Sequence, residues 1–192
     1  MATTQQVLTT LGTEPITADQ LLEMYGKGMR GELIRGVFCP TMPTGMKHGE
    51  IVMNLAFLIM DVVKPDKLGR IMGSDSGVKT ESNPDTVREP DIAYFSRERL
   101  PLDADVPGYA EIAPDLVVEV VSPSDSVREI AGKANMWINA GVQLVWVIWP
   151  ETQMVEIYRP GQPVATLAEN DTLTAENVLP QFNVPVSDVF NT

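Results

Sequence analysis

One apolar run, residues 116–121, constrains the fold of this chain more than any other segment. Its sequence, Leu-Val-Val-Glu-Val-Val, is apolar on both faces of an extended strand except at Glu119. A strand of this kind is typical of the centre of a sheet that is covered on both faces. The run therefore predicts an α/β fold, in which a central mixed β-sheet lies between flanking helices in an α–β–α layered core.

Turn, cap and periodicity signals predict the remaining elements. Thr17 and Gln20 fit a capping box, and Arg35-Gly36 fits a two-residue hairpin turn that places Glu32 opposite Cys39. Apolar residues recur at helical spacing after His48. We expect helices over residues 17–25, 48–63 and 122–140, and strands over residues 32–34, 37–39, 70–79, 88–95, 115–121, 142–149 and 154–158. We also expect a turn at residues 82–85, a long loop at 97–113 and an irregular tail with a short strand near Phe182.

Length and composition indicate a globular protein. The chain has 192 residues, 44% of them hydrophobic and 21% charged, so we expect one domain over residues 1–192 with a loose arm over residues 1–15. The chain has one cysteine, no signal-peptide pattern and no apolar run of membrane-helix length. We therefore expect a cytoplasmic protein. The net charge of −12 opposes non-specific binding to phosphate backbones, unless basic residues cluster or metal ions offset the carboxylates.

Two acidic residues stand out as candidates for chemistry. Glu119 lies within the apolar run, where an unpaired ionised carboxylate costs several kcal/mol. It is either a metal ligand or general base, or the partner of a structural Arg or Lys. Asp91 follows Pro90 at the start of another expected strand, and adjacent strands could bring the two carboxylates together. Because Mg²⁺ often takes one or two carboxylates plus water, the pair predicts a site for Mg²⁺ or Mn²⁺.

The segments Pro90-Asp91 and Glu119-Val120-Val121 resemble the PD-(D/E)XK nuclease signature, with valine at position 121 where the signature has lysine. The wider chain resembles the Uma-two family of restriction-endonuclease-like proteins over roughly residues 17–188. The segments that carry this resemblance are residues 32–36, the helix that begins at His48, residues 88–92 and 114–124, Lys133, and residues 141–146. Their order and spacing are more specific than any one of them.

The resemblance implies a restriction-endonuclease-like fold and a metal-dependent endonuclease that hydrolyses phosphodiester bonds of DNA. Asp91, Glu119 and the backbone carbonyl of Val120 would hold Mg²⁺ or Mn²⁺. Lys133, on the next helix, would replace the missing lysine. We expect Lys133 on the flank of an apolar stripe formed by residues 127, 130, 131, 134 and 138, from which its long stem could reach Glu119. The alternative is a surface lysine whose stem covers apolar neighbours.

Further residues are weaker candidates for the same site. Glu32 would add an acid near the metal, and His48 would orient a water molecule or contact a phosphate. Four basic residues are candidates for phosphate contacts: Arg35, Lys47, Arg88 and Arg128. Each of these six also fits an ordinary surface position. A homodimer is expected by analogy, because symmetric oligomers are common and an enzyme that cuts two strands suits twofold symmetry.

Two other functions remain open. One is a non-catalytic module with a nuclease fold that serves binding or oligomerisation, which the charge of −12 and Val121 favour. The other is a metal-dependent hydrolase of a different phosphorylated substrate.

Overall fold

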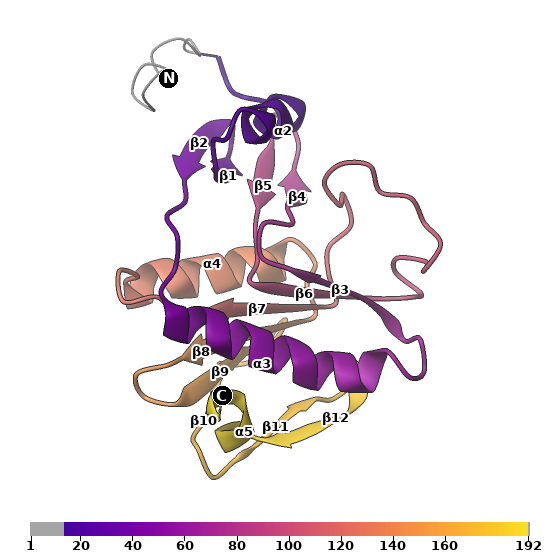
Figure 1. Cartoon of the computed structure of the whole chain (residues 1–192), viewed down its shortest axis with the longest axis vertical. Helices are drawn as coiled ribbons and strands as arrows, with labels where there is room; N and C mark the ends of the chain where they lie inside the picture. Colours follow the sequence, from indigo (N-terminus) through magenta and orange to yellow (C-terminus); the bar gives the residue numbers. More distant parts are fainter. Residues whose placement is uncertain (1–13, 192) are drawn as a thin grey trace. The chain divides into compact units, whose positions relative to one another are not determined.

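The structure is a computed structural model that describes residues 14–191 and divides into two compact units. The smaller unit comprises the described part of Met1–Pro43 together with Gly77–Glu89 and Val106–Ile112. The larger unit comprises Thr44–Ser76, Pro90–Asp105 and the described part of Ala113–Thr192. The loose arm expected over residues 1–15 falls almost wholly outside the described residues, and the organisation as one domain stays a prediction. Figure 1 labels the helices and strands.

The smaller unit holds one helix and an antiparallel sheet in the order β2-β1-β5-β4. Its elements are α2 (Ala18–Gly26), β1 (Gly31–Ile34), β2 (Val37–Pro40), β4 (Val78–Glu81) and β5 (Thr86–Arg88). The capping box of Thr17 and Gln20 is confirmed, and so is the pairing of Glu32 with Cys39. Arg35 and Gly36 have φ angles of 48° and 77°, the positive values that a type I′ turn requires.

The larger unit is built on a six-stranded sheet in the order β10-β9-β8-β7-β6-β3. Its elements are α3 (Met46–Val63), β3 (Gly69–Gly73), β6 (Ile92–Ser96), β7 (Leu116–Val120), α4 (Val127–Asn139), β8 (Leu144–Trp149), β9 (Met154–Tyr158), β10 (Ala165–Leu167), β11 (Thr172–Ala175), β12 (Leu179–Pro185) and α5 (Val186–Phe190). β7 and β8 pair in parallel and the other neighbours in antiparallel fashion. The predicted mixed sheet is confirmed.

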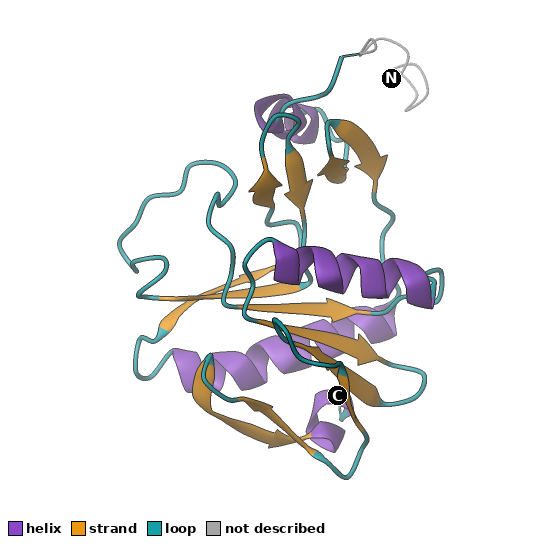
Figure 2. Cartoon of the chain, turned by 180° about the vertical axis from the view of Figure 1, so that it is seen from behind, coloured by secondary structure: helices purple, strands orange, loops and turns teal. Residues whose placement is uncertain are grey.

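The five residues of β7 are all buried because helices cover the sheet on both faces. Val118 belongs to the same hydrophobic core as Ile51 and Leu55 of α3. Its neighbour Glu119 points to the other face, where it contacts Trp137 of α4. Figure 2 shows α3 and α4 on opposite sides of this sheet. The α–β–α arrangement of the larger unit follows from this alternation.

The long strands expected over residues 70–79 and 88–95 are wrong, because each is broken. A turn at residues 74–75, where Asp75 has a φ of 65°, separates β3 from β4. Pro90, which has no N–H to donate to a ladder, separates β5 from β6. The predicted strand over residues 70–79 is thus split into β3 and β4, and the one over residues 88–95 into β5 and β6. β3 pairs with β6 in the six-stranded sheet, while β4 pairs with β5 in the sheet of the smaller unit. The turn at residues 82–85 is confirmed.

The helix expected over residues 122–140 begins later. Ser126 is its N-cap and forms a capping box with Glu129, whereas the Ser122 N–H donates to Asp125 in the preceding turn. Gly141 follows the helix with a φ of 100°, as predicted.

The short strand expected near Phe182 is confirmed as part of β12, but the otherwise irregular tail expected after residue 158 is wrong. β10 extends the six-stranded sheet, β11 and β12 form a hairpin, and α5 follows. The ring of Phe182 packs against Trp146 with the centroids 5.2 Å apart. None of the described helices has the length and apolar character required to cross a lipid bilayer. The cytoplasmic location stays a prediction.

Candidate active site

Asp91 and Glu119 meet where β7 ends and β6 begins. In this antiparallel pair Ile92 lies opposite Val118, so the next position along each strand places Asp91 opposite Glu119. The Asp91 carboxylate accepts a hydrogen bond from the Val120 N–H at 2.7 Å, which ties it to the end of β7. Asp91, immediately before β6, and Glu119 in β7 are 28 positions apart in the sequence, and the pairing of these two strands brings them together.

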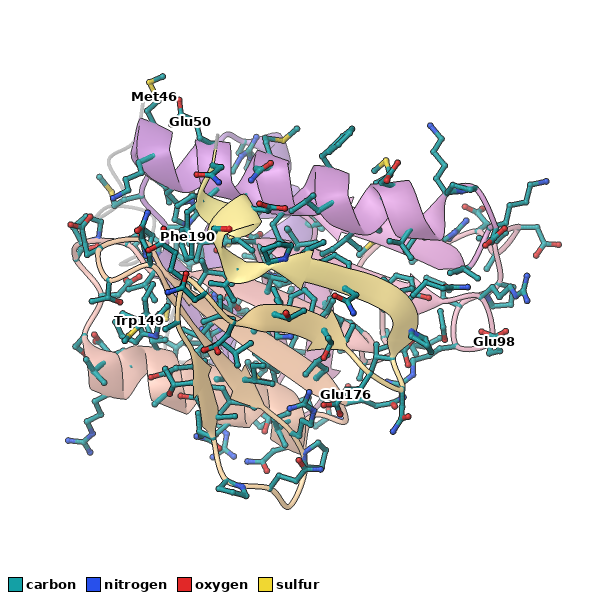
Figure 3. The ribbon with its side chains drawn as sticks, turned by 90° about the horizontal axis from the view of Figure 1, so that it is seen from below. Met46, Glu50, Glu98, Trp149, Glu176 and Phe190 are labelled. Carbon is teal, nitrogen blue, oxygen red and sulfur yellow. The ribbon has the colours of Figure 1, made fainter. Side chains whose placement is uncertain are left out.

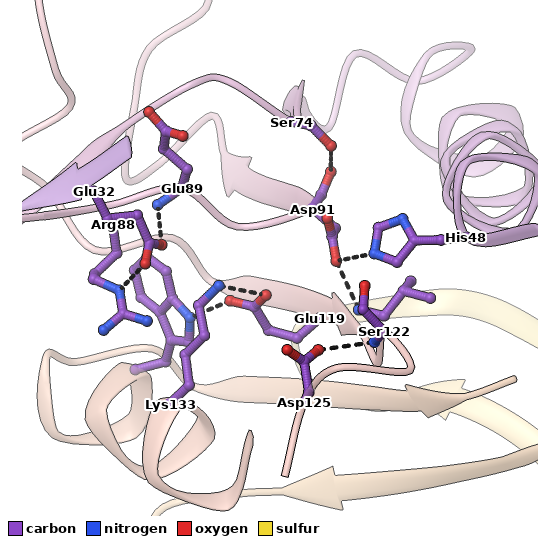
Figure 4. A network of polar contacts seen from close by, with 12 residues as sticks. Glu32, His48, Ser74, Arg88, Glu89, Asp91, Glu119, Ser122, Asp125 and Lys133 are labelled. Atoms are coloured by element: carbon purple, nitrogen blue, oxygen red, sulfur yellow. Dashed lines mark hydrogen bonds and ion pairs between the residues drawn. The ribbon is translucent and has the colours of Figure 1, made fainter. Parts of the chain in front are cut away.

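Glu119 is buried, with 4% of its surface exposed, and each of its carboxylate oxygens has a donor. Lys133 Nζ lies 2.8 Å from one oxygen, and Trp137 Nε1 lies 2.7 Å from the other. Figure 4 shows the Lys133 ammonium directed at this carboxylate from α4. A buried carboxylate with a cation and an N–H donor is stabilised against the cost of leaving water.

The balance of charges around Glu119 remains unfavourable to its ionised form. Burial raises the pKa of Glu119, and although the Lys133 ammonium opposes this, the negative charge of Asp91 raises the pKa further. The net pKa lies above the ordinary value of 4.5. The two carboxylates lie beside the Lys133 ammonium, and His48 is the other basic side chain of this group.

His48 holds Asp91 from the first turn of α3. Its Nε2 atom lies 3.3 Å from the carboxylate oxygen of Asp91 that also accepts the Val120 N–H. Burial lowers the pKa of His48, but hydrogen bonds to Asp91 and to the Val120 backbone, with the charges of Asp91 and Asp125, outweigh that effect. The pKa of His48 therefore lies above its ordinary value of 6.5. This contact, drawn in Figure 4, makes His48 a positioning residue for Asp91.

Lys133 reaches Glu119 from the face of α4 that packs against the sheet, and this face differs slightly from the one predicted. Its buried residues are Ile130, Ala134 and Trp137, whereas Val127 is exposed. The predicted stripe is therefore wrong at residue 127, whereas residues 130 and 134 are buried as expected and residues 131 and 138 are partly buried. Lys133 precedes Ala134 on the side of α4 that faces the sheet, so its stem runs along buried neighbours toward β7. The family resemblance predicted that Lys133 lies near Glu119. The alternative expectation for Glu119, a structural Arg or Lys partner, predicts the same contact.

Trp137 contacts the candidate site, although its sequence position did not single it out. It is fully buried, and its N–H donates to Glu119. One signal could have identified it. A buried tryptophan usually requires an acceptor for its N–H, and Trp137 lies one helical turn from Lys133, on the same face of α4.

Most of the other candidates form ion pairs within their own units. Glu32, in the smaller unit, forms an ion pair with Arg88 at 3.0 Å and accepts the Glu89 N–H at 2.9 Å. Its role beside the metal stays a prediction. Arg35 pairs with Glu81 in the smaller unit, Lys47 pairs with Glu151 in the larger unit, and Arg128 is exposed on α4. These positions neither support nor contradict the phosphate contacts expected for these residues, which stay predictions.

The donor set fits a hard divalent cation with few protein ligands. Within residues 14–191, no group of three or more His, Cys, Asp or Glu side chains is arranged to hold a metal ion. Asp91 Oδ2 accepts the bonds from Val120 and His48, and no described residue donates to Oδ1. Each Glu119 oxygen accepts one hydrogen bond and keeps a second lone pair. Two carboxylates completed by water suit Mg²⁺ or Mn²⁺.

Comparison with known proteins places this geometry in a family. Residues 18–187 match the model of the family Uma2, described as "Putative restriction endonuclease". A crystal structure described as that of a putative nuclease belonging to DUF820, from Anabaena variabilis, is 27% identical. The match covers 92% of this chain and 98% of that one, with a TM-score of 0.78. No curated protein matches. Since the family model spans most of the sequence, the chain belongs to the Uma2 family.

Proposed function

We propose that this protein is a metal-dependent endonuclease that hydrolyses DNA phosphodiester bonds. The observation that carries the proposal is the group at the end of β7, where the buried Glu119 meets the Lys133 ammonium next to the Asp91 carboxylate. A structural ion pair needs one carboxylate, whereas here a second carboxylate lies beside the first and is contacted by His48, so the group holds more ionisable side chains than an ion pair requires. The family description and the structural neighbour, both of which name nucleases, support the same reaction class.

Each residue has a distinct role in this proposal. Asp91 and Glu119 would hold Mg²⁺ or Mn²⁺, together with the carbonyl of Val120. The cation supplies Lewis-acid polarisation of a phosphoryl oxygen when it is bound. Lys133 would, as an ammonium, stabilise negative charge that develops on the phosphate and orient the attacking water, or, as the neutral amine, deprotonate that water. Trp137 and His48 position Glu119 and Asp91 respectively.

Cleavage assays with matched variants test the proposal. The purified chain is incubated with plasmid and with linear duplex DNA in Mg²⁺, Mn²⁺ or EDTA. We expect cleavage that requires the metal and falls by about 100-fold or more in Asp91→Asn, Glu119→Gln and Lys133→Met, the size of loss typical for a removed electrostatic contact. Asp103→Asn, an exposed loop carboxylate, is the control and should cleave like the wild type.

The result that contradicts the assignment is cleavage by all three variants at the rate of the wild type, with unchanged folding by circular dichroism. The same assay with nucleotides and small phosphodiesters separates DNA cleavage from hydrolysis of another phosphorylated substrate. Activity on those compounds alone would favour the latter function.

A second function, a non-catalytic module with a nuclease fold, has its own supporting observations. Both oxygens of Glu119 already accept hydrogen bonds, position 121 is valine, and the net charge is −12. This function predicts no affinity for divalent cations. Calorimetric titration of the metal-free protein with Mn²⁺ therefore distinguishes the two functions, because the endonuclease proposal requires binding that Glu119→Gln weakens.

A further inference from the structure

The outward face of α3 carries a row of large apolar side chains that no described residue covers. The opposite face of the helix is buried and supplies Ile51, Leu55 and Ile59 to the core. The exposed row consists of Met46 (81% exposed), Met53 (69%), Phe57 (68%) and Met60 (41%). Figure 3 shows Met46 at this outer surface, directed away from the sheet, with Glu50 one turn further along the helix.

The spacing of this row is that of a helix-packing seam. Its members follow one another at intervals of seven, four and three residues, so they lie on one stripe of the helix. Single exposed apolar residues are common, but a contiguous apolar row on a surface helix marks an interaction site. Methionine also suits such sites, because its flexible thioether adapts to a partner surface.

The stripe contains a hollow next to its central residue. This hollow, about 340 Å³ in volume, is lined by Phe57, Met60, Asp61, Lys64 and Pro65. Positions 57, 60, 61 and 64 are the four that surround a hole on a helix surface when a knob from a facing helix inserts into it. The row therefore offers protruding side chains at one end and a receiving hollow at the other.

The charged residues on this face differ in sign along the helix, with an acid before Phe57 and a base after it. Glu50 lies seven residues before Phe57, and Lys64 lies seven residues after it. Both are exposed, and neither forms an ion pair with any residue in the described range 14–191. Met53 lies four residues before Phe57, and Asp61 lies four residues after it.

Phe57 and the charges seven residues on either side of it are self-complementary, whereas Met53 pairs with Asp61, which lines the hollow. If a second α3 packs antiparallel with the twofold axis beside Phe57, each position before Phe57 faces the equally distant position after it in the partner. Met53 of one protomer then enters the hollow of its partner, the two Phe57 rings meet at the axis, and Glu50 faces the partner's Lys64 twice. An isologous contact requires this kind of match between a surface and itself.

We infer that the outward face of α3 is the docking surface for a second copy of this chain, through antiparallel α3–α3 packing about Phe57. The occupant is identified by the match of knob, hollow and charge just described. The helix is about 27 Å long, so the interface is of modest size and association in the micromolar range is expected. The inference does not depend on the proposed nuclease activity.

Sedimentation velocity over a concentration series, at about 0.15 M salt to screen the net charge, tests this surface. We expect a reversible monomer–dimer equilibrium in the wild type. Phe57→Glu should raise the dissociation constant at least about tenfold, as expected for a central aromatic residue. Val164→Glu, which places the same charge at an exposed apolar position away from α3, is the control and should dimerise like the wild type.

Charge reversal tests the antiparallel register. Glu50→Lys and Lys64→Glu should each weaken the dimer, by roughly fivefold, because each places like charges together twice. The double variant should regain most of the wild-type association. A double variant no better than the single ones would overturn the register, and a dimer unaffected by Phe57→Glu would overturn the surface. A wild type that stays monomeric at all concentrations, including one that instead binds phosphatidylcholine vesicles, would overturn the inference.

Discussion

The two ends of β7 each hold a buried carboxylate, and the two are built differently. Asp115, just before the strand, and Glu119, near its end, are each 4% exposed. They are four residues apart, so both point to the same face of the sheet. Asp115 accepts the Ser96 N–H at 2.7 Å and a Gln143 amide N–H at 2.9 Å, and Arg99 Nε lies 3.1 Å away. Glu119 has one ammonium, one indole N–H and a second carboxylate nearby.

The difference shows that burial of an acid does not by itself indicate a functional site. At Asp115 the cation is also an anchor for the backbone, since Arg99 donates to the carbonyls of Ala113, Pro114 and Gly141. This end of β7 is a closed network that joins a loop to the strand. At Glu119 a second carboxylate, Asp91, lies beside the ion pair and raises the pKa of Glu119, and His48 contacts Asp91. The second carboxylate, and not the burial, distinguishes the candidate site.

The largest expected effect is on stability at the Asp115 end. Asp115→Ala removes the acceptor of three donors and leaves the Arg99 guanidinium without its carboxylate. We expect the free energy of unfolding to fall by about 3–5 kcal/mol, measured by urea denaturation. Asp103→Ala, an exposed loop carboxylate, should change it by less than about 0.5 kcal/mol. An Asp115→Ala protein as stable as the wild type would remove the contrast between the two ends.

The next effect is a pH dependence that arises at the Glu119 end. Because the pKa of Glu119 is raised in the folded state, its stabilising contribution is complete below its ordinary value of 4.5 and is lost as the pH rises through the folded pKa, about 7. Without metal, we therefore expect wild-type stability to decline over this range relative to Glu119→Gln, by at most about 3 kcal/mol. Parallel stability curves for the two proteins in EDTA would contradict the raised pKa.

The smallest effect concerns the tryptophan that positions Glu119. Trp137→Phe keeps an aromatic ring but removes the N–H donor to a buried carboxylate, which should cost about 2 kcal/mol of unfolding free energy and reduce DNA cleavage. Trp146→Phe is the matched control, because Trp146 is equally buried and its N–H has no partner in the described part of the chain. Equal losses of cleavage in the two variants would mean that Trp137 acts through packing alone.

Local signals predicted local structure well. The apolar run predicted β7, the capping box of Thr17 predicted the start of α2, and Arg35-Gly36 predicted the hairpin. Glu119 and Asp91 were recognisable because an acid in or beside an apolar strand is unusual. These inferences needed only residues close together in the sequence.

Features that depend on residues far apart in the sequence were not predicted. Asp115 owes its partners to Ser96, Arg99 and Gln143, which no short motif connects. The prediction of two long strands was wrong because hydrophobic periodicity does not reveal that the chain turns into another sheet at Asp75 and at Pro90. The short strands of the tail are stabilised by side chains such as Phe182, whose partner Trp146 lies far along the chain.

The division of the chain into six alternating segments has a consequence for how it can be cut and how it folds. Neither unit is a continuous stretch of sequence, because each is assembled from three segments separated by parts of the other. Pairing of β1 with β5 therefore closes a loop that contains the whole of α3 and β3, and the entropy of that closure depends on how compact the intervening residues already are. A truncation at the boundary between residues 76 and 77 would remove strands from both sheets, whichever fragment is lost.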